Sequence, residues 1–91
     1  MGCESHPLIE YPTAYTFKVV GVREHAFPDF VRRLVSRALG RILHNDRIRR
    51  VRQSEHGKYQ SVTLDVELIG ESERRAVYHA LWDSERVLFY L

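Results

Sequence analysis

The chain has 91 residues, 44% of them hydrophobic and 29% charged, which is the composition of an ordinary globular protein. This length supports one hydrophobic core and excludes a separate catalytic domain. No stretch approaches the roughly 18 apolar residues of a membrane-spanning helix, so we expect no membrane contact. The net charge is only +2, yet residues 23–58 hold ten of the 14 Lys and Arg residues, which predicts a positively charged half.

The first nine residues predict a flexible tail. They lack the apolar core of a signal peptide, and they contain Cys3, the one cysteine of the chain. A single cysteine excludes an internal disulfide and suits a reducing compartment. We therefore expect a tail over residues 1–9, one domain over residues 10–91 and a cytoplasmic location.

The first half of the domain predicts a strand, a helix and a second strand. Residues 14–22 are rich in β-branched and aromatic side chains, as strands are. Apolar residues then recur at helical spacing from Phe27 to Ile42, and Pro28 suits the first turn of a helix. Residues 48–53 form a short, Arg-rich strand, which is followed by a turn at Gly57.

The second half predicts a strand, a helix and a last strand. Residues 59–68 alternate between polar and apolar side chains, which indicates a half-buried strand. Ser72 predicts the N-cap of a second helix, whose apolar stripe includes Val77 and Leu81. Trp82 follows that stripe as an anchor in the core or at its rim. Residues 86–91 are rich in apolar residues and predict the final strand.

The resulting order, βαββαβ, predicts an α+β fold of the ferredoxin-like kind. Right-handed crossovers place both helices on one face of a four-stranded antiparallel sheet. In this topology the first and third strands are central and the second and fourth strands are edges. The long, apolar first and third strands suit the central positions.

Three stretches carry a family resemblance: "EYPTAYTFKVVG" (10–21), "SEHGKYQSV" (54–62) and "VYHAL" (77–81). Together they resemble the YbeD-like family of small bacterial proteins of unknown function, and the similarity covers nearly all of residues 10–91. The resemblance implies a fold similar to ACT-type regulatory domains, which bind small effectors between paired sheets. By that analogy the effector site borders Gly21, Val22 and Arg23. No established activity is implied.

The stretch from Val19 to Val22, "VVGV", is also similar to the phosphate loop of acylphosphatases, which follows the first strand of this same fold. In that pattern an aromatic residue and an arginine come next. Here Glu24 and His25 occupy those positions, so the fork of donors that would hold phosphate is missing. A strand end is the favoured interpretation, and we expect no catalytic residues.

An arginine cluster marks the predicted second strand. Guanidinium groups bind phosphates and carboxylates, so the cluster predicts a site for an anion, a nucleic-acid backbone or an acidic partner. The alternative is protection of an edge strand from aggregation. The cluster consists of Arg47, Arg49, Arg50 and Arg52.

The last strand predicts an apolar patch. If Val87, Phe89 and Leu91 join the core, Leu88 and Tyr90 lie on the open face of the sheet near Val20. Such a patch is typical of self-association or of a partner site, and scattered exposed apolar residues are the other interpretation. RNA recognition on the central strands is not favoured, because that face offers Asp65 and no aromatic platform.

We therefore expect a non-enzymatic regulatory or small-effector-binding domain that acts through a homodimer or a partner protein. The histidines show no metal-ligand spacing, so we expect neither a metal nor a cofactor. Binding of nucleic acid or another polyanion through the Arg-rich strand is the second hypothesis. An acylphosphatase-like hydrolase is the third.

Overall fold

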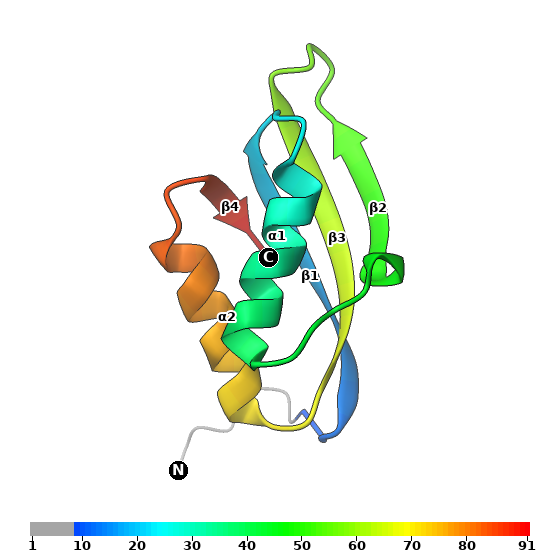
Figure 1. Cartoon of the computed structure of the whole chain (residues 1–91), viewed down its shortest axis with the longest axis vertical. Helices are drawn as coiled ribbons and strands as arrows, with labels where there is room; N and C mark the ends of the chain where they lie inside the picture. The colour runs from blue at the N-terminus through cyan, green and yellow to red at the C-terminus, as the bar shows by residue number, and fades with distance from the viewer. Residues whose placement is uncertain (1–8) are drawn as a thin grey trace.

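The computed structural model describes residues 9–91, so Cys3 and most of the expected tail lie outside the described residues. The elements follow one another along the chain as a strand β1 (Thr13–Val22), a helix α1 (Phe27–Leu39), a single 3-10 turn η2 (Asn45–Arg47), strands β2 (Ile48–Gln53) and β3 (Tyr59–Leu68), a helix α2 (Glu71–Asp83) and a strand β4 (Val87–Tyr90). The strands form one antiparallel sheet in the order β2-β3-β1-β4. Both helices cover one face of it (Figure 1). The βαββαβ prediction is confirmed, including the central positions of β1 and β3.

The core lies between the helices and this face of the sheet. Alternate residues of β1 and β3 point into it, because successive side chains of a strand point to opposite faces. Phe17 and Val19 of β1 are fully buried and pair with Leu64 and Val62 of β3. The helices close the core with Phe27, Val31 and Val35 from α1 and Val77 and Leu81 from α2, all fully buried.

The first helix is shorter than the sequence predicts. It ends at Leu39 because Gly40 adopts a left-handed conformation, with φ of 72°, and its N–H donates to the carbonyl oxygens of Ser36 and Arg37. Ile42, which the helical period places on the apolar face, is 78% exposed. Leu43 enters the core in its place, at 7% exposure.

The second helix also departs from the prediction. Gly70 is the N-cap and makes no side-chain hydrogen bond, so the assignment of Ser72 as the cap is wrong. Glu71 and Glu73 lie in the first turn, where carboxylates favour the positive end of the helix. Trp82 is 71% exposed, so its placement in or beside the core is wrong as well.

The last strand contains a β-bulge that changes which side chains face the helices. Val20 pairs with Phe89 and Gly21 pairs with Val87, which leaves Leu88 as the extra residue. Tyr90 pairs with the buried Val19 and therefore lies on the helix side, where its ring contacts that of Tyr78 on α2 at 5.7 Å between centroids. The prediction that Tyr90 lies on the open face is wrong, because the bulge inverts the alternation beyond it.

Candidate functional site

No helix or strand within residues 9–91 covers the face of the sheet opposite the helices (Figure 1). We call it the open sheet face. Its side chains alternate with the buried ones along each strand. They include Thr16, Lys18, Val20 and Val22 from β1, Arg49, Arg50 and Arg52 from β2, Tyr59, Ser61, Thr63 and Asp65 from β3, and Phe89 and Leu91 at the end of the chain.

One arginine of the predicted anion-binding cluster is already occupied on this face. Arg49 donates from Nε and Nη2 to the two carboxylate oxygens of Asp65, both at 2.8 Å. The Thr16 hydroxyl donates to the same carboxylate at 2.8 Å. The Arg49 guanidinium, helped by Thr16, holds the pKa of Asp65 below its usual range. Arg49 is therefore part of an internal ion pair.

The other arginines of the cluster separate. Arg47 lies before β2, in η2, and its Nε is 3.9 Å from a carboxylate oxygen of Asp46. Arg50 and Arg52 share the open sheet face with Lys18, and no ion pair among the described residues involves any of these three cations. The structure thus does not bring the four arginines together into one site. It leaves a smaller set of cations beside an exposed surface.

Apolar side chains lie next to one of these cations, Lys18, at the edge of the sheet opposite β2. Phe89 and Leu91 are 57% and 59% exposed, and they sit opposite Val20 and Lys18 respectively. Of the predicted interface residues, Val20 lies on this face, Leu88 is exposed at the bulge and Tyr90 is on the helix side. The sequence alternation missed Phe89 and Leu91, since it carries no signal for the inserted residue.

A cleft of about 540 Å³ opens at the end of the sheet where β1 leads into α1. We call it the strand-end cleft. It is formed by the β1–α1 connection, the end of β2, the β2–β3 hairpin and the start of β3. Its lining residues are Arg23, Glu24, His25, Gln53, Gly57, Lys58 and Gln60.

The predicted effector residues divide at this cleft. Arg23 lines it, and its backbone N–H donates to the carbonyl oxygen of Lys58 at 3.0 Å. Val22 points to the open sheet face, because it lies two residues after Val20 in β1 and pairs with Tyr59. Gly21 is buried, and an added Cβ would overlap the Phe27 ring and the Arg86 carbonyl oxygen. Gly21 therefore permits close packing, rather than cradling a ligand.

The two residues at the acylphosphatase positions also have defined places. Glu24 forms an ion pair with Arg86, whose guanidinium lies 3.9 Å from the centroid of the Phe30 ring. His25 lines the strand-end cleft. The carboxylate of Glu24 is thus used to hold the β1–α1 connection against the start of β4.

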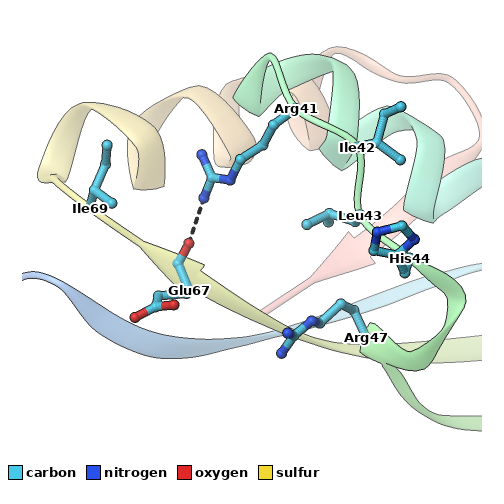
Figure 2. A pocket seen from close by; sticks show the side chains of 7 residues that line it. All are labelled: Arg41, Ile42, Leu43, His44, Arg47, Glu67 and Ile69. Carbon is cyan, nitrogen blue, oxygen red and sulfur yellow. Dashed lines mark hydrogen bonds between the residues drawn. The ribbon is translucent and has the colours of Figure 1, made fainter.

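A second cleft, of about 360 Å³, lies at the opposite end of α1 (Figure 2). Arg41 spans it and donates to the backbone oxygen of Glu67 at 2.6 Å and to both carboxylate oxygens of Glu73 at 2.6 and 3.3 Å. Ile42 and Ile69 form its exposed apolar rim. Because Arg41 is fully engaged, we interpret this region as a structural link between the α1 end and the β3–α2 connection.

The largest pKa shifts belong to groups of α2 and to their contacts with Tyr11 and Tyr15. Arg74, followed by the Tyr11 hydroxyl, binds the carboxylate of Glu71 and lowers its pKa to about 2. Burial, followed by a 3.0 Å hydrogen bond with the Tyr15 hydroxyl, raises the pKa of Tyr78. None of these groups lines the strand-end cleft, and the causes of their shifts are ion pairing, hydrogen bonding and burial within the packed structure.

Two further findings concern residues 9–91. No helix in that range is both long and apolar enough to cross a membrane. The same range brings together no group of three His, Cys, Asp or Glu side chains that could hold a metal ion.

Comparison with known proteins places the chain in a family. Residues 6–91 match the family described as "Protein of unknown function (DUF493)". The chain belongs to the DUF493 family. This DUF493 chain is 32% identical over 84 residues to the UPF0250 protein IL0958 of Idiomarina loihiensis. The matched region covers 92% of this chain and 91% of that protein. The resemblance to the YbeD-like family is thereby confirmed.

The DUF493 chain also matches a solved structure. The solution structure of protein HP0495 from H. pylori aligns with a TM-score of 0.68, covering 97% of this chain and 90% of that one. Their sequences are 19% identical, so this likeness supports the shared fold alone.

Proposed function

We propose that this DUF493 chain is a non-enzymatic regulatory domain that acts by binding a partner protein through the open sheet face. One observation carries the proposal. The exposed apolar residues Phe89 and Leu91 share the open sheet face with Lys18, which lies opposite Leu91, on a face that no element of residues 9–91 covers. Arg50 and Arg52 lie on the β2 edge of the same face, and none of the three cations has an ion pair among the described residues.

The charges of this face indicate what kind of partner it fits. Lys18, Arg50 and Arg52 are available, whereas the carboxylate of Asp65 is occupied by Arg49. Charges across an interface are arranged to complement each other. A surface with carboxylates beside an apolar ridge therefore fits better than a second copy of this face, which repeats the same excess of cations.

Phe89→Ser tests the proposal, with Trp82→Ser as the matched control, since both replace an exposed aromatic residue. The immobilised chain should retain a bacterial protein that is then purified and titrated against the wild type and both variants. We expect Phe89→Ser to weaken the purified complex at least tenfold and Trp82→Ser to leave it unchanged. Equal affinity of all three chains would contradict the proposal.

Two measurements separate the other interpretations. A dimeric mass in solution that becomes monomeric in Phe89→Ser would replace the partner with a second copy. Retention on heparin at low salt that disappears in the Arg50→Glu, Arg52→Glu double variant would favour a nucleic acid or another polyanion. Either of these results would overturn the proposal of a partner protein.

The small-effector part of the proposed function concerns a different surface. The strand-end cleft lies on the chain between the first strand and the hairpin, and its volume of about 540 Å³ is within the range typical of small-molecule sites. We propose this cleft, with Arg23 in its wall, as the effector site.

A further inference from the structure

Two cations of the strand-end cleft are held in place by the backbone. The hydrogen bond from the Arg23 N–H to the Lys58 carbonyl oxygen fixes both residues across the gap between the β1–α1 connection and the hairpin. Gly57 has φ of 71° in the hairpin turn, and a Cβ there would lie 3.2 Å from Nη1 of Arg23. The guanidinium of Arg23 therefore lies over the glycine at the hairpin tip.

These cations have no protein carboxylate to neutralise them. No ion pair among the described residues involves Arg23 or Lys58. Among residues 9–91, Glu24 is the one acidic residue that lines the cleft, and its carboxylate binds Arg86. The cleft thus attracts an anion, and it offers an arginine fork that suits a carboxylate.

Gln60 is the second and independent observation. It lines the cleft and is only 7% exposed, yet its Oε1 atom is buried without any hydrogen-bond partner. A buried polar atom without a partner destabilises the folded protein, so native structures nearly always satisfy such atoms. Gln60 pairs with Gly21 on one side and with Gln53 on the other. Because Gly21 has no side chain, no neighbour on β1 can supply the missing bond.

We infer that the strand-end cleft binds a small carboxylic acid that carries a hydroxyl group beside its carboxylate. The carboxylate binds Arg23 and Lys58, and the hydroxyl donates to Oε1 of Gln60, which the side-chain amide turns toward the cleft when the ligand binds. An amino group in the same place is disfavoured, because an ammonium would approach two cations with no carboxylate available to it. The inference rests on the proposed effector site and names the class of its ligand.

The test follows the ¹H–¹⁵N spectrum of the full chain as lactate is added. Propionate is the matched acid without the hydroxyl, alanine replaces the hydroxyl with an amino group, and inorganic phosphate is an anion alone. We expect lactate to shift the side-chain amide signals of Gln60 and the backbone amides of Gly57 and Lys58, with a dissociation constant of about 1 mM. Propionate and alanine should each bind at least fivefold more weakly.

Three variants assign the roles of the residues. Gln60→Leu fills the buried position with an apolar side chain of similar size and removes the amide. Lactate should therefore bind this variant no better than propionate does. Arg23→Ala should weaken both acids about tenfold, because it removes a charged hydrogen bond. Arg37→Ala, an exposed cation on α1 outside the cleft, is the control and should change neither affinity. The dispersion of each spectrum reports whether the variant is folded.

The result that overturns the inference is equally direct. No saturable shift at Gln60 with any probe, up to about 50 mM, would remove the ligand site. Equal affinity for lactate and propionate in the wild type, or an equal response to phosphate, would reduce the cleft to an anion site and remove the hydroxy acid. These results leave the partner-binding measurement with Phe89→Ser unaffected, because that measurement uses the open sheet face.

Discussion

Replacement of Gly21 with alanine tests how the first strand meets the first helix. An added Cβ would lie 2.5 Å from a ring carbon of Phe27 and 2.6 Å from the carbonyl oxygen of Arg86. Neither neighbour can easily move, because the Phe27 ring is fully buried and the Arg86 oxygen belongs to the backbone beside β4. Over-packing of this kind costs about 1–3 kcal/mol. We expect the Gly21→Ala variant to lose about 2 kcal/mol of unfolding free energy.

Urea unfolding followed by circular dichroism measures this change, and a domain of this size should also lose about 10 °C of melting temperature. Gly70→Ala is the control. A Cβ at Gly70 meets nothing within 4 Å, and its φ of −170° is extended backbone. The weaker N-cap and the stiffer unfolded chain oppose each other there, so we expect a change below about 0.5 kcal/mol. Equal stabilities of Gly21→Ala and the wild type would refute the packing argument.

Two further predictions concern stability, and a third concerns tryptophan fluorescence. The folded-state pKa of Glu71, about 2, lies below its ordinary value of 4.5. The stabilising effect of the Glu71 carboxylate is therefore complete above about pH 5 and is lost as the pH falls toward 2. Urea midpoints measured across this range should decline less steeply in Glu71→Gln than in the wild type. Tyr78→Phe should lower the unfolding free energy by about 1 kcal/mol in the same assay, because it removes the hydroxyl contact with Tyr15. The double variant with Tyr15→Phe should lose no more than about 0.5 kcal/mol beyond that. Additive losses would show that the two hydroxyls act separately. Trp82 is the one tryptophan and is 71% exposed, so its fluorescence should be that of a water-exposed indole in the folded protein and change little on unfolding; a large red shift on unfolding would contradict its exposed position.

The sequence predicts the sheet well where hydrophobic alternation is uninterrupted. The bounds of β3 agree with the predicted strand over residues 59–68, because each buried residue there alternates with a polar one. Alternation fails in β4, where Leu88 is inserted at the bulge. Whether a short apolar run contains a bulge depends on how β1 and β4 pair, and this pairing has no local sequence signal.

The candidate sites show the same division. Arg23 could be predicted at the end of the first strand from its position alone. Alternation places Gln60 on the buried face, in phase with Val62 and Leu64. Its position in the wall of the strand-end cleft could not be predicted, because the cleft is formed by segments that are distant along the chain. The arginine cluster divides because Arg49 lies at a register shift and binds Asp65 of the neighbouring strand β3.

The bulge at Leu88 separates the evolution of this surface from that of the core. If Leu88 instead took a regular place opposite Val20, Phe89 would move opposite Val19 and Tyr90 opposite Lys18, and the open sheet face would present a phenol to the partner in place of a phenyl ring. The buried residues of β1 and β3 would keep their letters. Related chains could therefore acquire different binding preferences through the presence or absence of this bulge, without any substitution in the sheet that supports the strand.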